Sequence, residues 1–485
     1  MTTTPETKIP KGKYPKSVPY IVGNEAAERF SFYGMKAILT VFLLDFFIKH
    51  FNLAQDVAEA RANEQTHLFI TLTYFLPIAG GILADWFMGK YRTILYLSIV
   101  YCAGHACLAA FDNNLTGFMF GLMLISIGSG GIKPCVSANV GDQFDKTNQD
   151  LLSKVFGWFY FSINFGSFFS TLLTPYLYHK YGPSVAFGVP GILMAIATFI
   201  FWLGRKKYIR VPPSGFKKEN FLAINFYALF NIGKKQKGQS LLDVATNKYS
   251  KESVDGIKSV WNVLAVFAFI PIFWALYDQN GSEWVIQATK MNLNFLGVTW
   301  LPAQVQAINP LLILAFIPLF GYVLYPAVEK MGIKVTPLRK IGAGMVLTAL
   351  TFVIIAWIQT RIDNGESPNI VWQILAYIII TAAEILISIT GLEYAYTQAP
   401  KSMKSTIMAF WLLTVSLGNY FVSLLNSNIS NKGFFAQLEG AKYYWFFFGI
   451  MCGFTLLFFL LSSRIKERSY IGYEDNNIDP NLVEN

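Results

Sequence analysis

The segment SVAFGVPGILMAIATFIFWLG, residues 184–204, decides the class of fold. It contains no charged residue over 21 positions, and about 18 or more predominantly apolar residues can span a bilayer as a helix. Of the 485 residues in the chain, 54% are apolar and 14% are charged, whereas roughly a quarter are charged in soluble globular proteins. The sequence therefore predicts an all-α membrane protein, and it argues against a disordered chain, a disulfide scaffold or an ordinary soluble enzyme.

Hydropathy predicts five spans before this segment and six after it, with a polar stretch at 205–257 between the two sets. The twelve predicted spans are 19–48, 64–87, 90–111, 115–139, 151–178, 184–204, 258–283, 303–328, 337–361, 369–395, 403–426 and 437–463. Six spans on each side of a central linker are typical of the major facilitator fold, in which a site lies between two pseudo-symmetric six-helix bundles. The predicted organisation is a tail at 1–18, a bundle at 19–204, a linker at 205–257, a bundle at 258–463 and a tail at 464–485.

The positions of the basic residues explain the net charge of +10. With both termini in the cytoplasm, 29 of the 39 Lys and Arg fall in cytoplasmic segments, seven in external loops and three within spans. This is the positive-inside distribution of membrane proteins, so no nucleic-acid partner is needed to account for the charge. Within the linker, NFLAINFYALFNIG (220–233) predicts an amphipathic helix at the membrane surface. The 12 basic residues at 205–258 can contact anionic lipid.

Neither a signal peptide nor a metal site is indicated. Residues 1–18 are polar and lack the apolar core of a signal peptide, so the tail is expected to stay in the cytoplasm. The four cysteines lie in apolar stretches and form no CxxC or Cys/His cluster, so they are expected to pack as small apolar residues: Cys102, Cys107, Cys135 and Cys452.

Ionisable residues inside the spans point to transport. On insertion scales each charge at the bilayer centre costs about 2.5–3.5 kcal/mol, so seven unpaired ones would cost on the order of 20 kcal/mol, more than a typical folding stability. Ion pairing between helices is the alternative for any one of them, but a transport pathway explains all seven better. They are Glu25, Glu28, Arg29, Lys36, Lys133, Asp278 and Glu384.

The first span places its charges on one face. At 100° per residue, Glu25, Glu28, Arg29, Phe32 and Tyr33 fall within an arc of about 140°. Glu25 and Arg29 are i,i+4 neighbours and can form an ion pair. Arginine keeps its proton, whereas a buried glutamate can take one up. One helix face therefore combines a permanent cation with two switchable anions.

Span two contains His67, and span four contains Lys133. His67 is either a hydrogen-bonded packing residue or, because histidine titrates near neutrality, a proton carrier. Pro134 predicts a helix break just after Lys133. The glycines ahead of it predict close approach of a neighbouring helix: Gly128, Gly130 and Gly131.

In the second half, Trp274 and Asp278 stand at i,i+4, as do Glu384 and Ser388. The intramembrane charge is +1 in the first half and −2 in the second. A ligand between the halves would meet cations on one side and carboxylates on the other. That polarity suits a zwitterion.

Enzyme chemistry has no support in the sequence. It contains no HExxH, GxSxG, P-loop or Gly-rich dinucleotide motif, and its four histidines are far apart. A membrane-embedded peptide hydrolase would need a nucleophile–base pair, which is not found. The chain is therefore predicted not to be an enzyme.

The first span, EAAERFSFYG (25–34), resembles the ExxERFxYYG motif of the proton-dependent oligopeptide transporter family of the major facilitator superfamily, with Phe32 in place of the first tyrosine. Further stretches similar to family segments are GILADWFMGKYR (81–92), GSGGIKPCVSANVGDQFD (128–145), FYFSINFGSFFSTLLTPYL (159–177), FWALYDQNGSEW (273–284) and AEILISITGLEYAYTQAP (383–400). The linker is too short for the two extra helices of many bacterial members, and the loop at 362–368 is too short for the external domain of animal members.

The resemblance implies a proton-coupled symporter that imports di- and tripeptides, and also peptide-like drugs, by alternating access. It implies that Arg29 and Lys133 face the peptide carboxylate and that Glu384 faces the amino terminus. The other implied residues are Asn164 and Asn309 for the peptide backbone, Tyr33, Tyr74, Trp274 and Trp411 for aromatic walls, and Glu25, Glu28, His67 and Asp278 for proton coupling. Ser388 is a further candidate for substrate binding because of its i,i+4 spacing from Glu384.

The resemblance also implies that no cofactor is bound, with protons as the coupling ion. Membrane lipid is expected as a partner and nucleic acid is not. The protein is expected to act as a monomer, with multiple spans in the cell (inner) membrane. The same fold moving another small anion or zwitterion is the competing interpretation.

Overall fold

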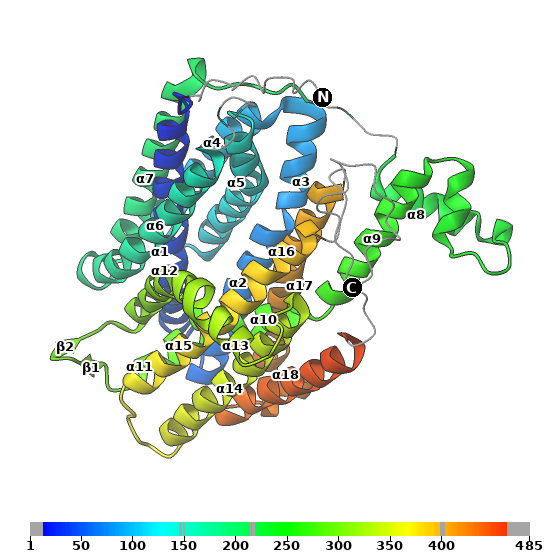
Figure 1. The fold of residues 1–485 in the computed structure, drawn as a ribbon. Coiled ribbons are helices and arrows are strands. Elements are labelled where there is room, and N and C mark those ends of the chain that lie inside the picture. Colours follow the sequence, from blue (N-terminus) through cyan, green and yellow to red (C-terminus); the bar gives the residue numbers. More distant parts are fainter. Residues whose placement is uncertain are drawn as a thin grey trace. The chain divides into compact units, whose positions relative to one another are not determined.

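The computed structural model describes residues 13–144, 148, 151–213, 215, 219–397 and 403–462. In these ranges the regular structure is helical apart from one short hairpin (Figure 1). The predicted tails at 1–18 and 464–485 lie outside the described residues, except for 13–18.

The chain divides into two compact units. The first comprises 1–215, 280–314 and 423–434, and the second comprises 216–279, 315–422 and 435–485. The first unit therefore joins the whole predicted segment 19–204 to the ends of three later spans. The predicted bundles at 19–204 and 258–463 stay a prediction. The two units are sets of residues that pack together, whereas the predicted bundles are sets of six consecutive spans.

The first unit contains α1 (Val18–Phe51), α2 (Gln55–Phe75), α3 (Pro77–Ile82), α4 (Lys90–Ala110), α5 (Leu115–Gly141), α6 (Leu152–Tyr181), α7 (Pro183–Leu203) and α11 (Glu283–Thr289). The second contains α8 (Phe221–Phe230), α9 (Lys251–Phe267), α10 (Ile270–Tyr277), α13 (Tyr325–Lys330), α14 (Pro337–Asp363), α15 (Val371–Glu384), α16 (Thr390–Thr397) and α18 (Ala441–Ser462). Two helices run from one unit into the other: α12 (Ile308–Leu319) and α17 (Lys404–Ser430).

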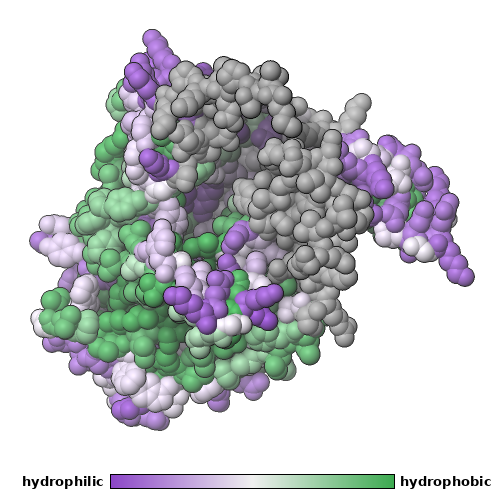
Figure 2. Space-filling view, in the orientation of Figure 1, coloured by the Kyte–Doolittle hydropathy of each residue, from purple (hydrophilic) through white to green (hydrophobic). Residues whose placement is uncertain are grey.

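The described residues contain ten helical stretches long and apolar enough to cross a membrane, and α9 with 270–289 makes an eleventh if that bent pair is one span. The other predicted span, 151–178, corresponds to the 30-residue α6, whose many Tyr, Ser, Thr and Gly residues lower its hydropathy. Figure 2 shows hydrophobic side chains over much of the visible helical surface. Such a surface suits lipid rather than water. A multi-span helical membrane protein is therefore confirmed, while the count of twelve stays a prediction.

Local sequence signals set several helix ends. The Thr336 hydroxyl accepts a hydrogen bond from the backbone N–H of Arg339 at 3.4 Å, and Pro337 follows as the first residue of α14. Gly182, at φ 84°, separates α6 from α7, which begins at Pro183. Glycine permits the positive φ, and proline tolerates a helix start because its missing N–H would have no helical acceptor there.

The predicted helix break after Lys133 is wrong. Pro134 lies inside α5, which continues to Gly141. Residues just before the proline pack tightly on α2 and α3, since a Cβ on Gly130 would lie 2.9 Å from the Thr73 carbonyl oxygen. Packing of this kind holds a membrane helix together through a proline that would break an isolated helix.

Spans seven and ten are not regular α-helices throughout. Span seven bends by 43° between α9 and the segment starting at Ile270, where Pro271 lacks the N–H needed to continue the helix. It then passes through a 3₁₀ turn at Asp278–Gly281. Span ten contains a π-helical turn, Ile385–Ile389, immediately after Glu384. Such turns occur often at functional sites.

A short antiparallel hairpin follows α11 and was not predicted. Its strands are β1 (Asn294–Phe295) and β2 (Val298–Thr299), paired Asn294 to Thr299 and Phe295 to Val298. The two turn residues, Leu296 and Gly297, have φ of 54° and 75°, as a type I′ turn requires. Leucine at the first position removes the Asn-Gly signature by which sequence reveals such turns.

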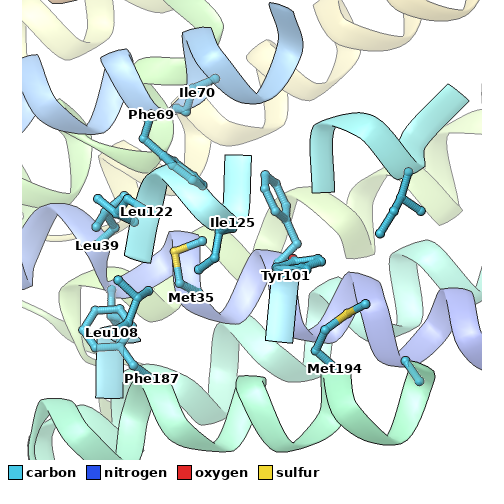
Figure 3. Packing of buried hydrophobic residues seen from close by; sticks show 14 of the residues in the cluster. Met35, Leu39, Phe69, Ile70, Tyr101, Leu108, Leu122, Ile125, Phe187 and Met194 are labelled. Carbon is cyan, nitrogen blue, oxygen red and sulfur yellow. The ribbon is translucent and has the colours of Figure 1, made fainter. Parts of the chain in front are cut away.

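The core of the first unit joins α1, α2, α4, α5 and α7. Figure 3 shows Met35 and Leu39 of α1 packed with Phe69, Ile125, Tyr101 and Phe187 of the other four helices. Close approach depends on small residues, as the sequence predicts: a Cβ on Gly128 would lie 2.8 Å from the Leu97 carbonyl oxygen of α4.

Candidate functional site

α1 brings three charged side chains together near its start. Nε of Arg29 lies 2.6 Å from Oε1 of Glu25 and 3.0 Å from Oε2 of Glu28. The two carboxylate side chains are 1% and 3% exposed, and that of Arg29 is 14% exposed. The predicted ion pair between Glu25 and Arg29 is present, and Glu28 joins it to form a charged triad.

The charged triad carries one more negative than positive charge when both glutamates are ionised. A buried charge without a partner is costly. Ser129 of α5 donates a hydrogen bond from its hydroxyl to Oε1 of Glu28 at 3.4 Å, which offsets part of that cost. A single proton on either carboxylate would neutralise the triad, because the guanidinium keeps its charge. The arrangement can therefore hold and release one proton without breaking every ion pair.

The ammonium group of Lys133 lies against two aromatic rings. Its Nζ is 3.9 Å from the ring centroid of Tyr74 and 4.4 Å from that of Phe32. A cation over a ring face is attracted by the π electrons, which phenylalanine offers as well as tyrosine. Phe32 stands where the ExxERFxYYG motif has its first tyrosine, and it still gives Lys133 an aromatic contact.

His67 is fully buried in α2. Its Nε2 lies 2.8 Å from the hydroxyl oxygen of Ser282, and its carbonyl oxygen accepts a hydrogen bond from Thr71 Oγ1 at 2.8 Å. The imidazole can accept or donate in the bond to Ser282, depending on its protonation. The hydrogen-bonded packing interpretation is therefore satisfied, and nothing in this geometry prevents a second role in proton transfer.

The second unit places Asp278 at the end of α10, 5% exposed. Asn419 of α17 donates a hydrogen bond to Asp278 Oδ2 at 2.8 Å and a second one to the Val415 carbonyl at 2.9 Å. The bond to Val415 fixes the amide in place, so the carboxylate meets an oriented donor.

Two tryptophans of the second unit lie edge to face. The rings of Trp274 and Trp411 have centroids 6.2 Å apart at 79°.

Glu384 ends α15 and Ser388 lies in the π-helical turn that follows it. The i,i+4 spacing predicted for Glu384 and Ser388 therefore lies across the start of a π-helical turn rather than within a regular α-helix.

The predicted backbone-binding amides lie in the first unit. Nδ2 of Asn164 donates to the Tyr160 carbonyl of its own helix at 3.0 Å, and Asn309 lies near the start of α12. The ring of Tyr33 packs edge to face on Phe32, with centroids 5.4 Å apart.

The structure places nine candidates in the first unit: Glu25, Glu28, Arg29, Tyr33, His67, Tyr74, Lys133, Asn164 and Asn309. It places five in the second: Trp274, Asp278, Glu384, Ser388 and Trp411.

Three partners of these residues were missed from the sequence: Ser129, Ser282 and Asn419. Each is a small polar residue in or beside an apolar span. Their positions hinted at hydrogen bonding, but no sequence spacing connects Ser282 with His67 or Asn419 with Asp278. Those contacts arise only when separate helices pack.

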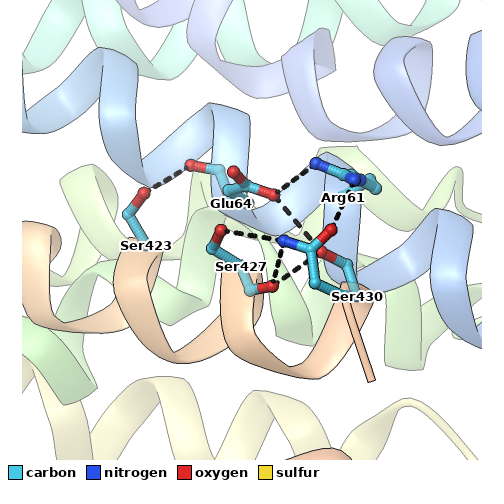
Figure 4. Close-up of polar contacts among 6 residues, drawn as sticks. Arg61, Glu64, Ser423, Ser427 and Ser430 are labelled. Atoms are coloured by element: carbon cyan, nitrogen blue, oxygen red, sulfur yellow. Dashed lines mark hydrogen bonds and ion pairs between the residues drawn. The ribbon is translucent and has the colours of Figure 1, made fainter. Parts of the chain in front are cut away.

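A polar cluster joins α2 to the end of α17 within the first unit (Figure 4). Arg61 pairs with Glu64 at 3.4 Å and donates to Asn431 Oδ1 at 2.8 Å. The Glu64 carbonyl accepts a hydrogen bond from Ser423 at 3.0 Å. The bond from Arg61 to Asn431 is exposed, whereas Ser423 is buried, so the cluster reaches from the surface into the packed part of the two helices.

No group of three or more His, Cys, Asp or Glu side chains within the described ranges could hold a metal ion.

Comparison with known proteins decides the family. Residues 91–446, most of the chain, match the POT family. The chain belongs to the POT family. The resemblance inferred from the ExxER face and the other stretches is confirmed.

Solved structures of POT family members share this fold. The structure described as the POT family transporter PepTSo is 40% identical, covers 94% of this chain and 99% of its own, and has a TM-score of 0.88. An auto-inhibited POT family peptide transporter is 37% identical, covers 94% and 98%, and also has a TM-score of 0.88.

Solute carrier family 15 member 2 of Oryctolagus cuniculus is 41% identical over 381 residues, which is 75% of this chain and 51% of that protein. The chain thus spans about half the length of the curated relatives that it matches.

Proposed function

We propose that this POT family chain is a proton-coupled symporter that imports di- and tripeptides into the cytoplasm by alternating access. The relatives named as peptide transporters support the substrate class. The observation that carries the proposal is the buried charged triad of Glu25, Glu28 and Arg29. The proposal includes twelve spans in a major facilitator fold, both termini in the cytoplasm, and a monomer in the cell (inner) membrane.

The charged triad supplies a reason for coupling. With both glutamates ionised the triad has a spare negative charge, and with one protonated it is neutral. Moving a neutral cluster between water-exposed and dry surroundings costs far less than moving a charged one. Protons entering from outside would therefore favour the conformational change that carries the peptide inward.

The distribution of charge supplies a reason for peptide recognition. Arg29 and Lys133 would face the peptide carboxylate and Glu384 its ammonium group. Asn164, Asn309 and Ser388 would bond the backbone, and the aromatic residues Tyr33, Tyr74, Trp274 and Trp411 would contact side chains. Backbone and terminal contacts of this kind tolerate many side chains, as a peptide transporter requires.

Uptake of a non-hydrolysable dipeptide into proteoliposomes tests the proposal. An inward proton gradient should drive accumulation of the intact peptide, and a protonophore should abolish it. Accumulation of a different small anion or zwitterion, with none of the dipeptide, would favour the alternative substrate. Cleavage without accumulation would favour a hydrolase.

Glu384→Gln should reduce the penalty for blocking a peptide's amino terminus. In the wild type, acetylation removes a charged partner of Glu384, with an expected loss of about 2 kcal/mol, or about thirtyfold in apparent Kd. In the variant the carboxylate is already gone, so acetylation should matter much less. Competition binding with paired free and acetylated dipeptides measures the four affinities. Simple addition of the two losses would show that Glu384 does not contact the ammonium group.

Asp278→Asn should retain peptide exchange but flatten its pH dependence. We propose that Arg29 and Asp278 exchange their present partners for one another to close one side of the site, and that protonation of Asp278 releases this contact. Asparagine mimics the protonated acid. His67 is the competing switch, so His67→Gln is measured in the same uptake assay from pH 5.5 to 8, roughly the range in which histidine titrates. A normal profile for Asp278→Asn with a flat one for His67→Gln would assign the switch to the histidine.

A further inference from the structure

α8, in the linker, exposes an unpartnered apolar face. Leu222, Phe226, Leu229 and Phe230 are 63%, 54%, 54% and 83% exposed. Their spacing of i, i+4, i+7 and i+8 puts all four on one side of the helix. In water, four adjacent exposed residues of this size would be unfavourable, which indicates that another surface covers them.

The opposite face of α8 is firmly attached to the second unit, where α8 lies beside α9 (Figure 1). Asn225 Oδ1 accepts a hydrogen bond from Trp261 Nε1 at 2.9 Å. The ring of Phe221 packs on that of Phe410, with centroids 5.1 Å apart, and Ile224 and Ala228 are buried. The apolar face is thus held outward rather than folded against the protein.

The contact with Trp261 gives the depth of α8. Along α9 the last charged residues are Asp255 and Lys258, and from Trp261 onward the helix carries no charge and is apolar except for Asn262. Trp261 is 49% exposed, and tryptophan is enriched where a span crosses from water into lipid. α8 therefore lies at the level of the membrane surface.

Positive charge follows α8 along the chain. Lys234, Lys235 and Lys237 follow α8 directly and are exposed, and no ion pair to them occurs among the described residues. The nearby carboxylate of Asp243 is already bound by Lys258, whose Nζ is 2.5 Å from Oδ1. That contact lowers the pKa of Asp243, so it remains paired and does not compete for the three lysines.

We propose that α8 docks on an anionic membrane leaflet, with Leu222, Phe226, Leu229 and Phe230 among the acyl chains. Lys234, Lys235 and Lys237 then bind the acidic lipid headgroups. With the proposed topology this is the cytoplasmic leaflet. The inference depends on the chain spanning a membrane and not on what it transports, so it stands or falls separately from peptide uptake.

Nitroxide accessibility in proteoliposomes tests the docking. Single cysteines are introduced as Phe226→Cys and Leu229→Cys in a variant lacking the four native cysteines, checked for unchanged thermal unfolding. Leu457→Cys on α18, 51% exposed, provides a lipid-facing reference, and Gln236→Cys in the exposed linker provides an aqueous one. Labels at 226 and 229 should collide with oxygen rather than with a water-soluble nickel chelate, and should lie about 5–10 Å below the headgroup boundary.

The lysines are tested by Lys234→Gln/Lys235→Gln/Lys237→Gln in vesicles with and without phosphatidylglycerol. In anionic vesicles the triple variant should lower the ratio of docked to undocked helix roughly 100-fold, while in phosphatidylcholine it should match the wild type. Lys330→Gln/Lys334→Gln, also exposed, is the matched control and should have no effect.

Nickel accessibility at 226 and 229 equal to that at 236 would overturn the proposal. Labels at 226 and 229 that are shielded from both oxygen and the nickel chelate, and that show dipolar broadening, would also overturn the proposal. They would show that a second copy of the chain covers the apolar face of α8. Equal docking in both lipids would overturn the role of the lysines.

Discussion

Glu25→Gln and Glu28→Gln transporters are expected to lose proton-driven accumulation of peptide while keeping downhill exchange. Glutamine retains the shape of glutamate and can still accept a hydrogen bond from Arg29, but it cannot bind and release the coupling proton. A pH difference of one unit supplies about 1.4 kcal/mol per proton, or about a tenfold accumulation at one proton per peptide. Accumulation should therefore fall from about tenfold to about onefold in either variant.

The measurement is uptake of a labelled non-hydrolysable dipeptide with an imposed pH gradient, beside counterflow without one. Glu366→Gln is the matched control, because Glu366 is exposed and pairs with Arg361 outside the charged triad. It should accumulate peptide like the wild type. If both triad variants also accumulate peptide normally, the charged triad does not couple protons to transport.

Gly80→Ala is expected to be strongly destabilising, whereas Gly81→Ala should be nearly silent. A Cβ on Gly80 would collide with the backbone of Gly131, coming 2.8 Å from its carbonyl carbon and closer still to its Cα and oxygen. Backbone atoms in two packed helices cannot move aside independently, so α3 must separate from α5. Overpacking of this kind costs about 1–3 kcal/mol and occasionally more. At Gly81, by contrast, a Cβ would meet nothing within 4 Å.

Thermal unfolding of the two purified variants in detergent measures the difference. The variants share residue type, helix and chemical change, so only the position of the added methyl group differs. Gly80→Ala should also weaken peptide binding, because Lys133 lies two residues after Gly131 and would shift away from the rings of Tyr74 and Phe32. Equal unfolding midpoints for the two variants would contradict the close approach of α3 and α5.

Features that depend on short stretches of chain could be predicted. The ion pair of Glu25 and Arg29 follows from i,i+4 spacing on one helix, and it is present at 2.6 Å. The linker helix at 220–233 follows from a compact apolar run between polar flanks, and α8 occupies Phe221–Phe230. The close packing at Gly128 follows from the absence of a side chain. Each of these features depends on residue types and spacings within a few turns of one helix.

Features that depend on neighbouring helices could not be predicted. Pro134 breaks an isolated helix but not α5, because the residues just before the proline pack closely on α2 and α3. The π-helical turn after Glu384 has no marker in the sequence. The hydrogen bonds between His67 and Ser282 and between Asn419 and Asp278 join residues more than 140 positions apart, and the periodicity of a single helix carries no information on pairs so far apart in the chain.

The sequence by itself determined that this chain is a multi-span helical membrane protein with an ExxER face, because hydrophobic length and helical spacing are properties of consecutive residues. Only the tertiary structure decided that Glu28 joins the pair of Glu25 and Arg29 under a hydroxyl from α5, that Lys133 rests on two rings, and that α8 turns its apolar face outward. The outward face of α8 follows from which of its sides packs on the second unit, and for the two charged groups the physical reason is the same. A buried polar or charged group is satisfied by whatever partner the packed helices bring to it, and that partner is chosen by three-dimensional fit rather than by position along the chain.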